Sequence, residues 1–173
     1  MNIILCGPPC VGKSTVAKLT AARLGWDVID TDLRIEEEYE RETGEVKSYG
    51  EIYKIKGDNN FRVLEKQALL RLNNIEKGVI ALGGGVKEIP LRGVVIFLRA
   101  SFETLWQRLL MRPQLPAYLP KKDARKRFET HVLDRLSACE AMADITLDTD
   151  NLSPEKIVDR ICTVKEERTY GIQ

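Results

Sequence analysis

A phosphate-binding loop stands near the start of the chain. Residues 7–14 read GPPCVGKS and fit the pattern G-x-x-x-x-G-K-[ST]. Glycines let successive backbone N–H groups point at phosphate oxygens, and the start of the helix that follows adds a favourable dipole. The lysine supplies a cation for the β- and γ-phosphates, and the serine offers a hydroxyl to Mg²⁺. The motif predicts that ATP and Mg²⁺ bind through Cys10, Val11, Gly12, Lys13, Ser14 and Thr15.

Two aspartates, Asp30 and Asp32, follow the next short apolar run. Residues two apart in an extended chain project to the same side. Ligands of open parallel α/β sheets bind at the carboxyl ends of the strands, so both carboxylates should face the transferred phosphate. One carboxylate could hold Mg²⁺, directly or through water, and the other could accept or orient the proton of an acceptor hydroxyl. Asp30 is the better metal partner because the run 79–82 has no aspartate of its own, which leaves the hydroxyl to Asp32. The alternative is that Asp32 merely caps the following helix.

Three consecutive glycines, Gly83, Gly84 and Gly85, follow another apolar run. They should lie at the same edge of the sheet, where glycine lets backbone N–H groups approach a substrate without obstruction by a side chain. The alternative is a flexible turn.

The elements that must position these residues alternate between short apolar runs and longer amphipathic ones, which is typical of an α/β fold. Strands are predicted at 3–6, 27–29, 79–82, 93–98 and 145–147, and helices at 13–24, 33–43, 48–56, 59–75, after Ser101, at 123–143 and after Ser153. Three prolines make the stretch 112–122 irregular, and we expect the charged tail, 164–173, to be loose.

The composition excludes several classes of protein. The chain has 173 residues, 43% of them hydrophobic, which suits a single domain over 1–173. Its 27 Lys and Arg against 26 Asp and Glu argue against bulk electrostatic binding of nucleic acid. The apolar segment 3–6 is far too short for a signal peptide or a membrane span. The four cysteines match neither a zinc site nor a disulfide framework, so we expect reduced thiols and a cytoplasmic protein.

Taken together, the motifs resemble the shikimate kinase family. After the phosphate loop come Asp30-Thr31-Asp32, then Phe61-Arg62-x-x-Glu65 and then Gly83-Gly84-Gly85, and the resemblance covers roughly residues 1–163. It implies a P-loop fold like that of nucleoside monophosphate kinases, a three-layer α/β sandwich with a central five-stranded parallel sheet. A helical substrate-binding region at about 33–75 and a lid at about 112–122 would complete it. The implied reaction is transfer of the ATP γ-phosphate to the 3-hydroxyl of shikimate, and we expect a monomer with no nucleic-acid or membrane partner.

The resemblance also implies roles for the residues of an acceptor site. Arg62 would bind the shikimate carboxylate through its planar guanidinium, and Glu65 would orient that arginine. The residues alone leave open a surface ion pair between the two, three residues apart. Arg135 would meet the carboxylate from the opposite side, and Tyr53 and Phe61 match apolar wall positions.

Arg112-Pro113 resembles the start of the lid in this family. Arg112 would lie over the ATP phosphates and stabilise developing charge while the lid excludes water, and Arg108 could share the contact with the nucleotide. We interpret the basic residues in 121–127 as a solvated face and His131 as a structural residue.

Two other functions remain open from the sequence. The nearer is another small-molecule or nucleotide kinase of the same fold, such as a gluconate or nucleoside monophosphate kinase, although paired arginines favour an acidic acceptor. The other is a nucleotide-binding regulatory domain that phosphorylates no metabolite, against which the clustered acceptor-site residues count.

Overall fold

Five parallel strands form the central sheet of the computed structural model, which describes residues 1–83, 86, 91–113, 115, 119 and 122–171. Their order across the sheet is β2-β3-β1-β4-β5, and each pair of neighbours is parallel. The strands are β1 (Ile3–Cys6), β2 (Asp27–Asp30), β3 (Gly78–Ala81), β4 (Val94–Arg99) and β5 (Ile145–Asp148). All five predicted strands are confirmed, with bounds that differ by no more than one residue.

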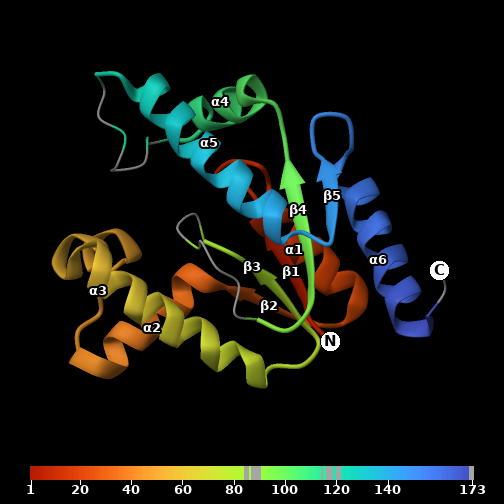
Figure 1. Cartoon of the computed structure of the whole chain (residues 1–173), viewed down its shortest axis with the longest axis horizontal. Coiled ribbons are helices and arrows are strands. Elements are labelled where there is room, and N and C mark those ends of the chain that lie inside the picture. The colour runs from red at the N-terminus through yellow and green to blue at the C-terminus, as the bar shows by residue number, and fades with distance from the viewer. Residues whose placement is uncertain (84–85, 87–90, 114, 116–118, 120–121, 172–173) are drawn as a thin grey trace.

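Helices cover both faces of this sheet and make a three-layer sandwich (Figure 1). They are α1 (Lys13–Leu24), α2 (Thr31–Thr43), α3 (Tyr49–Arg71), α4 (Phe102–Leu110), α5 (Ala124–Met142) and α6 (Pro154–Tyr170). α1, α4 and α6 pack with one set of strand side chains, which includes Leu5 and Ile96. The end of α3 and the end of α5 pack with the other set, which includes Ile4 and Phe97. Alternate residues of a strand point to opposite faces, so the fully apolar β1 contributes to both cores.

α2 and α3 form a pair beside the sheet, at the lower left of Figure 1. They enclose a small core of their own, in which Ile35 of α2 packs with Phe61 of α3. The helices predicted at 48–56 and 59–75 are both present, joined within α3 at Gly57, where φ is 68° and ψ 170°. Glycine reaches a positive φ without the steric penalty of a side chain, so this one residue permits the bend.

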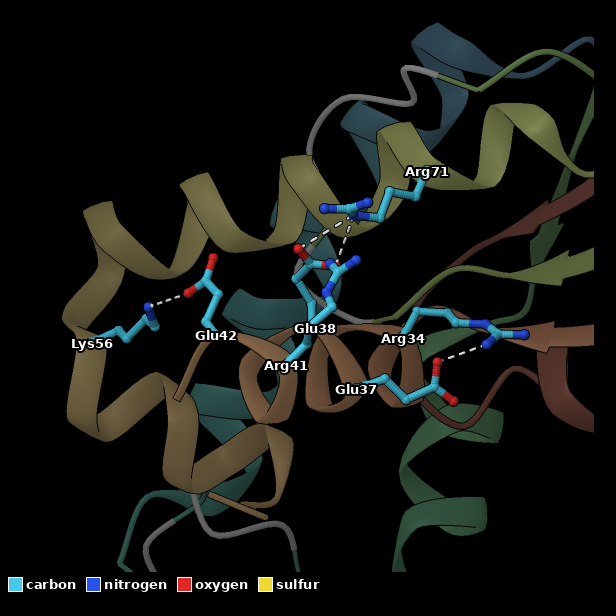
Figure 2. A network of polar contacts seen from close by, with 7 residues as sticks. All are labelled: Arg34, Glu37, Glu38, Arg41, Glu42, Lys56 and Arg71. Carbon is cyan, nitrogen blue, oxygen red and sulfur yellow. Dashed lines mark hydrogen bonds and ion pairs between the residues drawn. The ribbon is translucent and has the colours of Figure 1, made fainter. Parts of the chain in front are cut away.

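A polar network joins α2 to α3 across the edge of that small core (Figure 2). Glu38 of α2 is buried, and its carboxylate pairs with Arg41 one turn along and with Arg71 of α3, whose Nε lies 3.0 Å from Glu38 Oε2. Further along, Lys56 Nζ lies 3.1 Å from Glu42 Oε2. A buried carboxylate requires such partners, because an unpaired charge away from water is costly.

The C-terminal segment differs from the prediction of a loose tail. α6 continues to Tyr170 and ends at Gly171, which has a φ of 67°. Val164 is buried in the core to which α1 and the strands also contribute, and Arg168 Nη2 donates to Asp144 Oδ1 over 2.9 Å. The charged residues of 165–169 therefore belong to the largely exposed part of an anchored helix. None of the helices in the described part of the chain is long and apolar enough to cross a membrane.

Candidate active site

A cavity of about 1110 Å³ opens at the carboxyl ends of the strands. The phosphate loop forms its floor, the starts of α2 and α3 form one side, and α4, α5 and the start of α6 form the other. Pockets for a single small ligand measure roughly 300–1000 Å³, so this cavity has room for a nucleotide together with a second small molecule. Of the predicted residues, it is lined by Cys10, Val11, Gly12, Lys13, Ser14, Thr15, Asp30, Asp32, Tyr53, Arg62, Gly83, Arg108 and Arg112.

The phosphate loop turns between β1 and α1 on residues with positive φ. Gly7 has a φ of 148°, and a Cβ there would overlap the carbonyl oxygen of Leu98 in β4. Gly12 has a φ of 104° and precedes the first turn of α1. Cys10 also has a positive φ, 66°, although its side chain disfavours that conformation. Burial raises the pKa of the Cys10 thiol, which disfavours the reactive thiolate.

Lys13 lies inside the phosphate loop. Its Nζ donates to the carbonyl oxygens of Gly7 at 2.8 Å and Pro8 at 3.0 Å, so the ammonium group is held at the centre of the turn. Burial, with a smaller contribution from the positive charge of Arg135, lowers the pKa of Lys13 to about 8. Lys13 is therefore a cation at neutral pH and is placed where the loop N–H groups gather.

The two aspartates have different roles at the start of α2, and the helix cap is not Asp32. α2 begins at Thr31, and Asp30 Oδ1 accepts the backbone N–H of Asp32 at 3.0 Å, so Asp30 is the capping residue. Asp32 Oδ1 is buried and accepts no hydrogen bond from any residue that the structure describes. Burial, and then the charge of Asp30, raise the pKa of Asp32 to about 6. The interpretation of Asp32 as a mere cap is wrong.

Gly83 lies directly against Asp32 after the end of β3. A Cβ at Gly83 would overlap Asp32 Oδ1, so no larger residue fits without moving that carboxylate. The Gly83 N–H donates to Thr31 Oγ1 at 2.7 Å, which ties the β3 end to the start of α2. The sequence did not reveal the role of Thr31. Gly84 and Gly85 lie outside the described residues.

Arg62 lines the cavity from α3. Its Nη1 donates to the buried Glu65 Oε2 at 2.8 Å, and its Nε lies 3.4 Å from Asp58 Oδ1. The guanidinium carbon also lies 5.6 Å from the centre of the Phe61 ring. Phe61 itself is fully buried, behind the cavity wall, where the ring of Tyr53 meets it edge-on at 5.2 Å. Phe61 therefore supports the wall without being part of it.

Arg135 lies behind the cavity, where its side chain binds two backbone carbonyl groups. It is buried, and it donates through Nη1 to Val86 O and through Nη2 to Gly83 O, each at 2.8 Å. Burial lowers the pKa of this guanidinium, which nevertheless stays charged. In this structure Arg135 holds the carbonyl groups of Gly83 and Val86, and a direct contact with a substrate stays a prediction.

The other end of the cavity is built by residues from distant parts of the chain. Arg108 of α4 donates to Val11 O at 3.3 Å, to Thr149 Oγ1 at 3.0 Å and to Thr149 O at 3.0 Å, which joins the phosphate loop to the segment after β5. Arg112 is exposed and lines the cavity nearby. Sequence reasoning missed Thr149, Leu152, Pro154 and Ile157, which line this end. His131, interpreted above as a structural residue, also lines the cavity.

The structure describes only some residues of the basic segment 121–127 and of the predicted lid at about 112–122. Lys122, Arg125, Lys126 and Arg127 are exposed, which confirms the solvated face for them, whereas Lys121 lies outside the described residues. Arg125 also packs over Phe102 and Trp106, with centroid distances of 5.3 and 5.7 Å. Of the predicted lid, residues 114, 116–118 and 120–121 likewise lie outside the description.

The donor set suits a magnesium ion that binds mainly through phosphate. No group of three or more His, Cys, Asp or Glu side chains able to hold a metal occurs in the described part of the chain. Mg²⁺ usually keeps several waters and takes one or two carboxylates together with substrate phosphates. Ser14 and Asp30, which both line the cavity, offer one hydroxyl and one carboxylate, so they fit this pattern.

Comparison with known proteins gives consistent matches over nearly the whole chain. The family model described as shikimate kinase matches residues 9–165. The shikimate kinase of Thermodesulfovibrio yellowstonii is 32% identical over 177 residues, which cover 98% of each chain. That of Lactococcus lactis is 38% identical over 172 residues, which cover 93% of this chain and 96% of the relative.

A solved structure extends the likeness to three dimensions. The shikimate kinase from Acinetobacter baumannii in complex with shikimate has a TM-score of 0.80 to this chain at 26% identity, and the match covers 98% of this chain and 94% of that one. The five-stranded parallel sheet with helices on both faces is thus shared with that protein.

Proposed function

The chain belongs to the shikimate kinase family, and on that premise we propose that it transfers the γ-phosphate of ATP to the 3-hydroxyl of shikimate, giving shikimate 3-phosphate and ADP. The observation that carries the proposal is the Asp32 carboxylate. Its Oδ1 is buried and accepts no hydrogen bond from a described residue, and it lies in a cavity that the phosphate loop and Arg62 both line.

Asp32 would accept or orient the proton of the attacking hydroxyl. With a pKa raised to about 6, it is mostly ionised at neutral pH and is more basic than an ordinary aspartate. Gly83, which has no side chain, lets the end of β3 pack directly against this carboxylate and fix its position. Catalysis would come mainly from positioning and from stabilisation of charge.

The phosphate side would be held by backbone N–H groups of the loop and by cations. Lys13 would exchange its loop carbonyl partners for the β- and γ-phosphates, and Arg112 and Arg108 would add positive charge on the opposite side. Ser14 and Asp30 would hold Mg²⁺, which neutralises phosphate charge when bound.

The acceptor side would bind an acid with several hydroxyls. Arg62, oriented by Glu65, would bind the carboxylate, and Tyr53 would line the wall. Arg135 would reach the same carboxylate by releasing a backbone carbonyl. The N–H groups of Gly84 and Gly85 would approach the ring, whereas the Gly83 N–H is held by Thr31.

The decisive test is release of ADP, measured by a coupled assay with and without shikimate. Turnover that depends on shikimate, and not on gluconate or a nucleoside monophosphate, supports the proposal. Equal turnover with one of those acceptors would favour the corresponding kinase instead. Binding of ATP without turnover on any acceptor would favour a regulatory domain.

We also propose that the protein acts as a monomer in the cytoplasm, without a nucleic-acid or membrane partner. The near-balanced charge supports the absence of a nucleic-acid partner. Light scattering at several concentrations tests the oligomeric state, and a mass twice that of the chain would contradict it.

A further inference from the structure

Tyr49 is a cavity residue to which the sequence motifs assign no role. It is the first residue of α3, where Ser48 and Glu51 form a capping box, and its backbone N–H donates to Glu36 Oε1 of α2 at 2.7 Å. Its ring meets the buried Phe61 edge-on, with a centroid distance of 5.0 Å and an interplanar angle of 83°. The ring is thus fixed by its packing on Phe61 and by the anchored helix start, and Tyr49 lines the cavity from this position.

The Tyr49 hydroxyl makes no hydrogen bond with any other residue in the described part of the chain. It differs in this from the neighbouring Tyr53, whose hydroxyl donates to Asp58 Oδ1 at 3.2 Å. A half-buried hydroxyl on a rigid ring is expected to have a partner, from protein, water or ligand. Tyr49 therefore brings an unused donor to the cavity.

Charged residues of the acceptor site affect the pKa of the Tyr49 phenol. Burial raises the pKa of Tyr49 above its usual range, the negative charges of Asp32 and Glu65 raise it further, and Arg62 and Arg135 oppose the shift. The phenol is therefore neutral at any working pH and keeps its proton to donate. These four residues are the ones proposed above for the acceptor hydroxyl and carboxylate.

We propose that the Tyr49 hydroxyl donates a hydrogen bond to bound shikimate and is a specificity-determining residue of the acceptor site. The inference rests on the proposed function. The ring of a phenylalanine would fill the same volume against Phe61 but leave the polar edge of the acceptor unpaired. A hydrogen bond of ordinary net strength corresponds to about a two- to tenfold change in affinity.

The test compares Tyr49→Phe with the wild type and with Tyr39→Phe. Tyr39 is a matched control because it is buried in the same small core of α2 and α3 but does not line the cavity. Calorimetry gives the Kd for shikimate, steady-state kinetics give KM for both substrates, and thermal unfolding gives Tm. Tyr49→Phe should raise the Kd and KM for shikimate about two- to tenfold, with KM for ATP and Tm unchanged.

The possible failures can be told apart. If the wild type turns over shikimate and Tyr49→Phe binds it equally well, the role of Tyr49 is overturned while the proposed function stands. That role is also overturned if Tyr39→Phe weakens shikimate binding as much, or if KM for ATP changes in parallel. If the wild type releases no ADP in response to shikimate, the proposed function fails and the role of Tyr49 fails with it.

Discussion

The two sides of the cavity are positioned by different parts of the fold. The phosphate loop follows β1, whose side chains are fully or almost fully buried between the two layers of helices. The acceptor side rests on α2 and α3, which have a small core of their own and the Glu38 network at its edge. Backbone geometry therefore sets the nucleotide side, whereas side-chain contacts set the acceptor side. Substitutions in α2, α3 and the end of β3 should change acceptor chemistry while ATP binding persists.

The largest expected effect is that of Asp32→Asn. The amide cannot take a proton from the hydroxyl, and general-base groups contribute about 10²- to 10⁴-fold, so kcat should fall by that order. The phosphate loop is untouched, so the Kd for ATP should change little. Steady-state ADP release and calorimetry with ATP measure the two quantities. Near-normal turnover would show that Asp32 does not take part in the chemical step. Loss of ATP binding would show that the acceptor side and the nucleotide side do not act separately.

Gly83→Ala tests the close approach of β3 to the acceptor aspartate. The added Cβ would overlap Asp32 Oδ1, and the Gly83 N–H also holds Thr31, so the carboxylate must move. A displacement of about 1 Å can cost roughly 10²-fold in rate, and we expect kcat/KM for shikimate to fall by that order. Gly50→Ala is a suitable control, because Gly50 also lines the cavity but a Cβ there meets nothing within 4 Å. Equal effects of the two substitutions would contradict this account.

The loss of activity at acid pH should come from the acceptor side. The pKa of Asp32 in the free protein is raised from 3.8 to about 6, and the base form is the ionised one, so kcat/KM for shikimate should fall as pH drops through about 6. One pH unit below that pKa about one tenth of the carboxylate remains ionised, which predicts roughly a tenfold loss at pH 5. Initial rates at shikimate concentrations well below KM, between pH 5 and 8, measure the effect. A flat profile down to pH 5 would mean that Asp32 does not act as the base.

The same division explains what the sequence could predict. The strands, α1 and the phosphate loop follow from local patterns, because an apolar run, a turn and a helix start lie within one continuous segment. Asp32 and Gly83 could also be placed at the cavity, since each follows an apolar run that ends at the edge of the sheet, and Arg62 could be placed there through the family resemblance.

Contacts between distant segments were not accessible in this way. Nothing local to Arg135 indicates that it binds the carbonyls of Gly83 and Val86, and nothing local to Phe61 places it behind the wall rather than in it. Tyr49 and Thr149 reach the cavity only because α3 and β5 fold against the sheet. A sequence motif identifies the residue types of the site, whereas packing decides which atoms face the ligand.

The smallest expected effect concerns the Glu38 network, where the comparison between the two sides can be made quantitative. Glu38→Ala removes a buried carboxylate but leaves Arg41 and Arg71, which are about half exposed and regain water. The free energy of unfolding should therefore fall by about 1–2 kcal/mol, less than when a fully buried partner is stranded. Because α2 carries Asp32 and α3 carries Arg62, KM for shikimate should rise severalfold while KM for ATP stays the same.

Glu37→Ala is the matched control in the same helix. Its partner Arg34 lies 2.6 Å away on the exposed surface of α2, and such pairs contribute about 0–1 kcal/mol (Figure 2). Urea unfolding and steady-state kinetics on both variants separate the buried link between helices from a surface pair within one helix. A rise in KM for ATP in Glu38→Ala would show that the two sides are mechanically coupled through β2 and the sheet, which join α2 to the phosphate loop.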